Sequence, residues 1–173
     1  MNFLIILYMK ITKMIIILLE ITLVILVVGG STIKRLNPWW VSGFVDAEGS
    51  FGISTTINDT SFKTSLQFKI TQKSHNEAVL QELVEYFGSG KVHIDNSTTN
   101  TLKFQIQDIS TIRDKVIPHF DKYPLISSKN LDYNDWKSVL NILSEKSHFS
   151  KEGKSKILEL KNQMNHSRSE LSR

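Results

Sequence analysis

An acidic side chain at the end of a predicted helix is the first feature of the sequence that could do chemistry. The helix runs from Pro38 to about Glu48 and stops at Gly49, which leaves Glu48 in its last turn. A carboxylate there faces the negative pole of the helix dipole, so it does not stabilise the helix. A bound cation would explain it, because Mg²⁺ prefers oxygen ligands such as carboxylates. The plainer alternative is a helix that merely ends in an acid.

Two small residues on the same helix indicate how a second carboxylate could be supplied. Gly43 and Ala47 lie one helical turn apart, so one side of the helix has almost no side chain. Glycine inside a helix costs about 1 kcal/mol relative to alanine, and small residues allow another helix to approach closely. Two such helices side by side would bring two copies of Glu48 together. Paired carboxylates that hold two metal ions suit phosphodiester hydrolysis, because one ion activates water and the other stabilises the leaving oxygen.

The rest of the sequence predicts the elements that must position this helix. Asn37 is a favourable N-cap, and Pro38 loses no hydrogen bond at the first helical position. After the helix, periodicity and turn residues predict, in chain order, strands over 50–57 and 65–71 with a turn at 58–59, a helix over 74–88, strands over 91–95 and 101–107, a helix over 110–120, an extended stretch over 124–128, and helices over 131–143 and 152–164.

Two local signals refine this order. Ser74 followed by Glu77 predicts a capping box at the start of the helix over 74–88. Pro118 predicts a break in the helix over 110–120, because proline removes a helical hydrogen bond.

The strands alternate between apolar and polar side chains, as in Leu66, Phe68 and Ile70 on one face and Gln67, Lys69 and Thr71 on the other. This pattern is typical of an antiparallel sheet with helices on only one face. We therefore predict the α+β class, with the order αββαββα followed by C-terminal helices.

Charged residues are distributed unevenly between the two predicted hairpins and the helix over 74–88. The two hairpins carry a net charge of +3, whereas the helix over 74–88 carries −3. Amide, hydroxyl and imidazole groups can contact base edges, and lysines can contact phosphates. A solvated polar sheet face is the alternative. The candidate nucleic-acid contacts are Gln67, Lys69, Thr71, Lys91, His93, Lys103, Gln105 and Gln107.

Composition excludes several classes of protein. The chain has 173 residues and no cysteine, which excludes a disulfide scaffold, a cysteine-ligated zinc site and a thiol nucleophile. The net charge of +4 weakly favours an anionic partner. Abundant Ile, Asn, Lys and Ser are typical of AT-rich, often organellar, coding sequences.

Residues 1–30 differ from the rest because they are mostly apolar. A membrane helix and an extension without function, such as read-through from a preceding reading frame, both remain open. The absence of a basic start and of a small-residue cleavage site disfavours a secretory signal. We therefore predict an apolar leader over 1–30 and a single domain over 31–173.

The segment Val41 to Gly49 resembles the LAGLIDADG motif of homing endonucleases, with Glu48 as its final acid. Later segments are similar to further parts of the family pattern, in the same order: 68–72 to its second strand, 87–92 to its helix-to-strand turn, 123–129 to the stretch that brings in a basic residue, and 152–165 to its closing helix. The resemblance is strongest to the fungal mitochondrial intron-encoded branch of the family, whose members often carry two motifs, whereas this sequence carries a single motif. It implies a saddle-shaped sheet.

The resemblance also implies roles for individual residues. Glu48 would bind the catalytic metal, Mg²⁺ or Mn²⁺, with help from the Ala47 carbonyl. Gly43 and Ala47 would pack against a second motif helix. Gln72 would lie near the active-site water, and Lys129 near the scissile phosphate, although an ordinary surface lysine is the alternative for Lys129.

Further implications concern Asp46, the partners and the function. Asp46, the other acid of the motif, is expected to be structural. The expected function is site-specific double-strand cleavage of DNA in intron homing, by a homodimer, in the mitochondrion rather than the chloroplast. Alternatives are a truncated, inactive half of a two-motif enzyme, a maturase that binds intron RNA, and a membrane-anchored protein whose sheet is only a scaffold.

Overall fold

The computed structural model describes residues 15, 36–58 and 61–164 of the chain. The predicted leader over 1–30 lies outside the described residues except for Ile15, so its interpretation and its boundary with the domain over 31–173 stay predictions. In the described part of the chain, no helix is long and apolar enough to cross a membrane.

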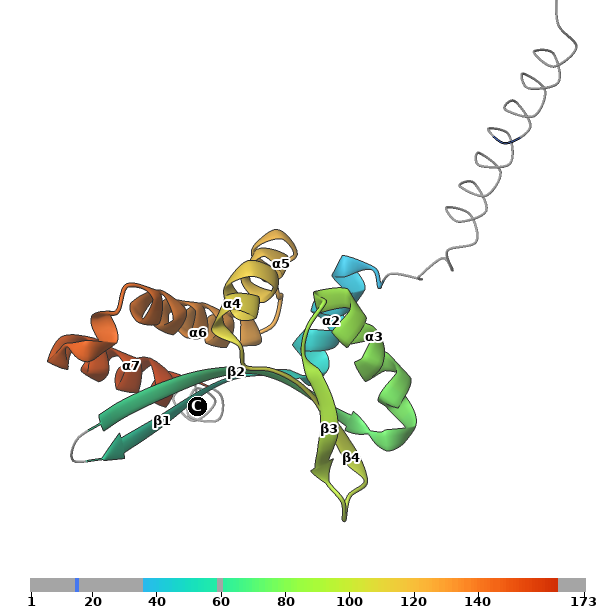
Figure 1. Cartoon of the computed structure of the whole chain (residues 1–173), viewed down its shortest axis with the longest axis horizontal. Helices are drawn as coiled ribbons and strands as arrows, with labels where there is room; N and C mark the ends of the chain where they lie inside the picture. Colours follow the sequence, from blue (N-terminus) through green and yellow to red (C-terminus); the bar gives the residue numbers. More distant parts are fainter. Residues whose placement is uncertain (1–14, 16–35, 59–60, 165–173) are drawn as a thin grey trace, which may run out of the picture. The chain divides into compact units, whose positions relative to one another are not determined.

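The described domain has the predicted order of elements (Figure 1). These are α2 (Pro38–Glu48), β1 (Gly49–Asn58), β2 (Ser61–Lys73), α3 (Glu77–Phe87), β3 (Lys91–Asn96), β4 (Thr101–Ile106), α4 (Ile109–Thr111), α5 (Ile117–Lys122), α6 (Lys129–Ser144) and α7 (Lys151–Gln163). The α+β class and the αββαββα order with C-terminal helices are confirmed.

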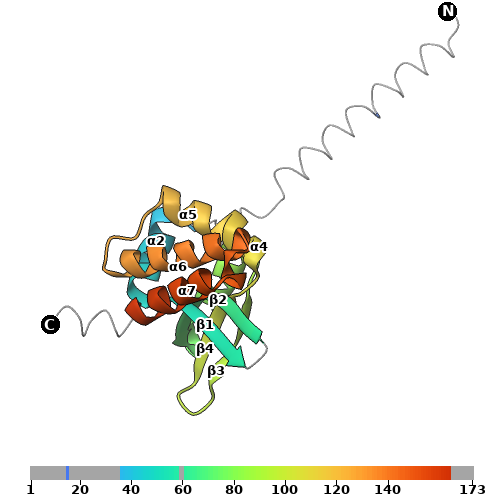
Figure 2. The ribbon, with the colours of Figure 1, turned by 90° about the vertical axis from the view of Figure 1, so that its left-hand side faces the viewer.

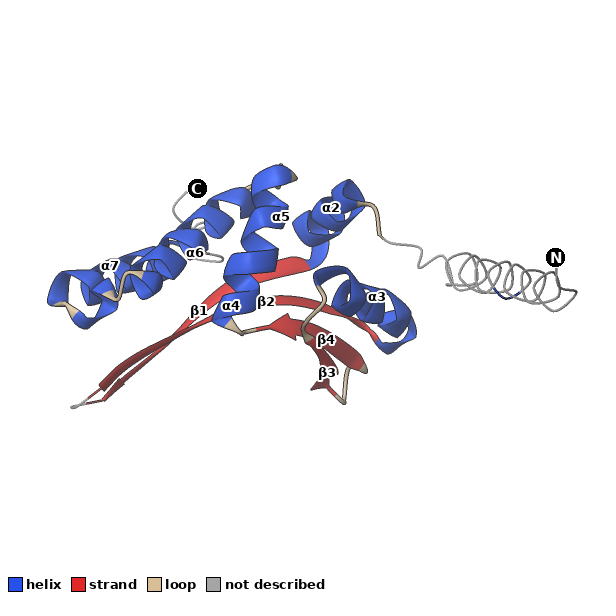
Figure 3. Ribbon diagram, turned by 45° about the horizontal axis from the view of Figure 1, so that its top comes forward, coloured by secondary structure: helices blue, strands red, loops and turns tan. Residues whose placement is uncertain are grey.

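The four strands form one curved antiparallel sheet in the order β1-β2-β4-β3. Cross-strand pairs such as Phe51–Phe68 and Phe68–Ile106 set the register, so the apolar rows of adjacent strands coincide. The helices between Pro38 and Gln163 all lie on the face that carries these rows (Figures 2 and 3). Among the described residues, the opposite, polar face is left uncovered.

The start of α2 is as predicted. The Asn37 side chain accepts hydrogen bonds from the backbone N–H groups of Trp39 (2.9 Å) and Trp40 (3.4 Å). At the other end, β1 begins directly after Glu48. A Cβ on Gly49 would lie 2.6 Å from a Val45 side-chain carbon, so only glycine allows the chain to pass from helix to strand without a loop.

The predicted capping box is wrong. The Ser74 N–H donates to the Asn100 carbonyl at 3.0 Å, which ties the end of β2 to the turn between β3 and β4. Residues 74–76 consequently form a 3-10 turn, and α3 begins at Glu77 without a side-chain cap. A long-range backbone bond therefore overrides the local capping signal.

The predicted break at Pro118 is also wrong. The backbone stays helical from Ile109 to Lys122, because residues 112–116 form a π-helical turn between α4 and α5. In this wider turn the Ile117 N–H donates to the Ile112 carbonyl. The wider turn lets the helix accommodate a proline, which has no N–H to donate.

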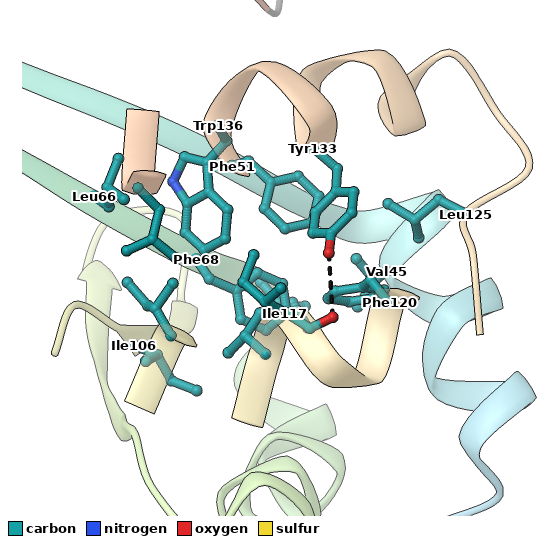
Figure 4. Packing of buried hydrophobic residues seen from close by; sticks show 14 of the residues in the cluster. Val45, Phe51, Leu66, Phe68, Ile106, Ile117, Phe120, Leu125, Tyr133 and Trp136 are labelled. Atoms are coloured by element: carbon teal, nitrogen blue, oxygen red, sulfur yellow. Dashed lines mark hydrogen bonds between the residues drawn. The ribbon is translucent and has the colours of Figure 1, made fainter. Parts of the chain in front are cut away.

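Aromatic side chains form the centre of the core. Phe68 in β2 packs against Phe51, Phe87, Phe104 and Phe120, with ring centroids 5.4–6.0 Å apart. These rings join the sheet to α3 and α5. Figure 4 shows the same cluster extending to α6, where the Tyr133 hydroxyl donates to the Ile117 carbonyl at 3.2 Å.

A buried polar network fixes the inner side of α2. The Ser42 hydroxyl donates to the Tyr123 carbonyl at 2.7 Å, so its 3.2 Å contact with His119 Nε2 has the imidazole N–H as donor. His119 Nδ1 is then the acceptor for the Tyr86 hydroxyl at 3.0 Å. Neutral His119 thus connects α2, α3 and α5.

Burial lowers the pKa of His119 to about 4, because the interior disfavours the charged imidazolium. Between pH 6.5 and 4 the unfolded chain binds a proton that the folded chain does not, so the free energy of unfolding should fall as the pH falls. We expect a loss of about 2 kcal/mol over this window. Urea denaturation at several pH values measures it. The variant His119→Gln should have a flatter pH dependence, and an unchanged slope would contradict this assignment.

Candidate active site

The motif helix α2 has one buried side and one bare side. Val41, Ser42 and Val45 are buried against the domain. On the other side Gly43 and Ala47 are exposed, and a Cβ on Gly43 would meet nothing within 4 Å. The described chain therefore leaves a strip of α2 on which a second helix would fit, as the spacing of Gly43 and Ala47 predicts.

The bare side continues toward the start of α2 as aromatic surface. Trp39 is 56% exposed and Trp40 44% exposed, and Trp40 stacks on Phe44 with ring centroids 5.0 Å apart. Large exposed aromatic residues beside a small-residue strip are typical of a protein–protein contact.

Glu48 and the Ala47 carbonyl lie together at the end of α2, and both residues are exposed. Carboxylate and carbonyl oxygens suit a hard divalent cation. Within the described residues, however, no group of three or more His, Cys, Asp or Glu side chains could hold a metal ion. The described part of one chain thus offers a partial set of ligands of the right chemical type.

The Lys129 ammonium lies at the same end of α2. It donates to the carbonyls of Val45 (2.9 Å) and Asp46 (2.7 Å), so it is not an ordinary surface lysine. Burial lowers the pKa of Lys129, while the negative charges of Asp46, Glu48 and Asp132 oppose this effect. A cation at the C-terminal end of a helix interacts favourably with the helix dipole.

Asp46 has the structural role expected of it. Its carboxylate accepts hydrogen bonds from the backbone N–H groups of Ile126 (2.7 Å) and Ser127 (3.3 Å) and from the Ser127 hydroxyl (2.6 Å). It therefore holds the loop that leads into α6.

Gln72 lies near the end of β2. Its neighbour on the same face, Ile70, pairs with Gly49, so Gln72 extends beyond the junction of α2 and β1. Its side-chain oxygen accepts a hydrogen bond from Asn76 Nδ2 at 3.0 Å. This contact fixes the amide, and a role near the active-site water stays a prediction.

The candidate nucleic-acid contacts form rows across the uncovered face. Lys69, Gln105 and Lys91 are paired in register on β2, β4 and β3, and Thr71, Lys103 and His93 form the next row. The sheet thus brings together residues that are far apart in the sequence, while the role of each in binding DNA stays a prediction.

Contacts on this face already constrain some of these side chains. Gln105 Nε2 donates to Gln67 Oε1 at 3.0 Å, and Lys103 forms an ion pair with Asp95 at 2.9 Å. Gln107 follows the end of β4 and, with Lys91, His93 and Gln105, lines a hollow of about 420 Å³. The polar face therefore has a concave region as well as hydrogen-bonding groups.

His119 and Ser42 fix the inner side of α2, and the sequence alone does not predict this role. Ser42 lies within the motif helix and His119 is separated from it by 77 positions, so spacing gives no sign of their contact. The one available signal is weak: His119 is flanked by apolar residues in a predicted helix.

Comparison with known proteins identifies the family of the chain. A model of the LAGLIDADG endonuclease family matches residues 41–140. The chain is 34% identical over 120 residues to a probable intron-encoded endonuclease 3 of Neurospora crassa, covering 68% of this chain and 22% of that protein. It is 32% identical to an uncharacterised protein in ND4 intron 1 of Podospora anserina, covering 69% and 27%. The chain thus spans about a quarter of the length of these relatives.

Solved structures give the same result at 33% identity. The LAGLIDADG homing endonuclease I-GzeII in complex with its DNA target has a TM-score of 0.73, over 76% of this chain and 45% of that one. I-SmaMI bound to uncleaved DNA in the presence of calcium ions has a TM-score of 0.71, over 75% and 45%. For the homing endonuclease I-TnaI the TM-score is 0.71, over 80% and 96%. With the motif helix, the sheet and the matched residues in agreement, the chain belongs to the LAGLIDADG endonuclease family.

Proposed function

We propose that the protein is a site-specific endonuclease that makes double-strand cuts in DNA during intron homing. The observation that carries this proposal is the end of α2, a helix with a bare outer side, where Glu48 is exposed and the Lys129 ammonium, which comes from α6, contacts the last carbonyls. DNA would bind the uncovered polar face of the sheet. The DNA-bound structures of I-GzeII and I-SmaMI support this choice of partner.

We propose that the reaction depends on Mg²⁺ or Mn²⁺. The Glu48 carboxylate and the Ala47 carbonyl would hold the ion, which supplies activation of water and stabilisation of the leaving oxygen when it is bound. Lys129 would place a positive charge beside the scissile phosphate. Gln72 would orient a water molecule.

We propose that a second copy of the chain completes the site. A C2 pair with Gly43 and Ala47 at its centre would bring two Glu48 carboxylates together. In favour of pairing, the match covers 96% of the I-TnaI chain, so a homing endonuclease chain can consist almost entirely of this one domain. A second motif within a longer protein would complete the site in the same way. Sedimentation of the chain with and without DNA tests the pairing.

The relatives also support a proposed location. The ND4 intron named for one relative favours a protein encoded by a mitochondrial intron and acting in the mitochondrion. The abundance of Ile, Asn, Lys and Ser, which is typical of AT-rich coding sequences, agrees with that origin.

The variant Glu48→Gln should abolish cleavage while it preserves DNA binding, because the amide keeps the shape of the side chain but loses the charge that holds the cation. We expect cleavage to fall by at least about a hundredfold. The measurement uses Mg²⁺ and a duplex that carries the uninterrupted insertion site, with binding followed by gel shift.

Glu82→Gln, an exposed change on α3, is the matched control and should cut normally. Normal cutting by Glu48→Gln would show that the metal assignment is wrong. Metal-independent binding of intron RNA without any DNA cleavage by the wild-type protein would favour the maturase alternative instead.

A bulky residue at position 43 should separate folding from pairing. Nothing in the described chain lies within 4 Å of a Cβ on Gly43, so Gly43→Leu should fold and gain up to about 1 kcal/mol of helix stability. It should also block close approach of a second α2, so DNA-dependent pairing and cleavage should both be lost. Thermal melting and sedimentation velocity measure the two effects.

Ala78→Leu, at an exposed position of α3, is the control and should pair normally. If Gly43→Leu pairs and cleaves like the wild type, the contact between motif helices lies elsewhere.

A further inference from the structure

We infer that Asp46 is a positioning residue for Lys129 and that it acts through Ser127. The inference rests on the proposed function, because it concerns how the lysine of that site is held. It gives the second acid of the motif a role in catalysis without contact with substrate or metal.

Asp46 is joined to the loop before α6 by three hydrogen bonds. Its two carboxylate oxygens accept separately, one from the Ile126 N–H and the other from the N–H and hydroxyl of Ser127. Hydrogen bonds to an ionised carboxylate are about twice as strong as those between neutral groups. The carboxylate therefore fixes both the path of the loop and the rotamer of Ser127.

Ser127 passes this constraint to Lys129. Its hydroxyl donates a hydrogen bond to Asp46 and accepts one from the Lys129 backbone N–H at 3.2 Å. Lys129 is the first residue of α6, so its backbone position follows from the loop. The Lys129 ammonium then returns to α2 and donates to the carbonyls of Val45 and Asp46. The contacts form a closed ring that begins and ends at Asp46.

Apolar packing does little to hold this loop. Ile126 is 91% exposed, and Ser127 and Ser128 are exposed as well. Leu125 is buried and anchors the start of the loop. Backbone bonds from Asn130 and Leu131 tie Ser127 and Ser128 to α6, and the hydrogen bonds to Asp46 tie the same loop to α2.

The arrangement has a consequence for the site. Glu48 and Asp46 belong to the same helical turn, so the helix that supplies Glu48 also fixes the position of the Lys129 ammonium. Lys129 should then keep its position relative to Glu48 when two motif helices pair. A lysine held only by its own element would have no such restraint.

Asp46→Asn and Ser127→Ala test the inference. Both should lower the single-turnover rate of DNA cleavage by at least about tenfold, with DNA affinity unchanged, since neither side chain lies on the polar sheet face. The matched controls are Asp114→Asn, which removes an exposed ion pair with Arg113, and Ser128→Ala, whose side chain caps no helix. Both controls should cleave at the wild-type rate.

A double-mutant cycle separates positioning from general stability. Lys129→Met should slow cleavage by itself, and adding Asp46→Asn to Lys129→Met should then slow it no further. Additive losses would overturn the inference, because they would mean that Asp46 acts independently of Lys129. Equal weakening of DNA binding and cleavage in Asp46→Asn would overturn it as well.

Hydrogen exchange of the free protein gives a readout that does not depend on cleavage. In Asp46→Asn the amides of Ile126 and Ser127 should exchange several-fold faster, whereas the buried strand amides should not change. Unchanged exchange at both amides would overturn the inference alone. Absence of DNA cleavage by the wild-type protein would instead overturn the proposed function, and with it any catalytic role of Asp46.

Discussion

The direct passage from α2 into β1 constrains everything else in the candidate site. No loop separates Glu48 from the strand, and Gly49 makes this possible because any side chain there would collide with Val45. The acid at the end of the helix is therefore fixed to the sheet whose polar face is the candidate DNA surface. A flexible linker at this point would let the acid move independently of that surface.

Two polar networks hold α2 in place, one on its inner face and one at its C-terminal end. Toward the interior, neutral His119 links Ser42 to Tyr86 in a region from which charge is excluded. At the C-terminal end, Lys129 supplies a charge that offsets the exposed carbonyls of the helix. The interior network thus uses the neutral imidazole of His119, whereas the candidate site uses the charged ammonium of Lys129 beside the acids of α2.

The two faces of the sheet meet opposite requirements. The helix-covered face buries aromatic rings such as Phe51 and Phe68, which provide rigid, closely packed area. The uncovered face carries amides and lysines in aligned rows, where hydrogen-bonding groups remain available. Strand alternation produces both faces from the same segments, since successive side chains point in opposite directions.

The sequence by itself determined the features that depend on near neighbours. These include the limits of α2, set by Asn37, Pro38 and Gly49, and the alternation that separates the faces of the sheet. The motif also identified Glu48 and the bare side of its helix. Local signals failed where a distant group competed with them, as when the Asn100 carbonyl took the Ser74 N–H.

Only the tertiary structure decided which distant groups form hydrogen bonds with α2. The Lys129 ammonium contacts α2 across more than eighty positions, and Asp46 reaches Ser127 across a similar separation. His119 reaches Ser42 in the same way. No periodicity encodes such contacts, because they depend on how α5 and α6 pack against α2 and the sheet.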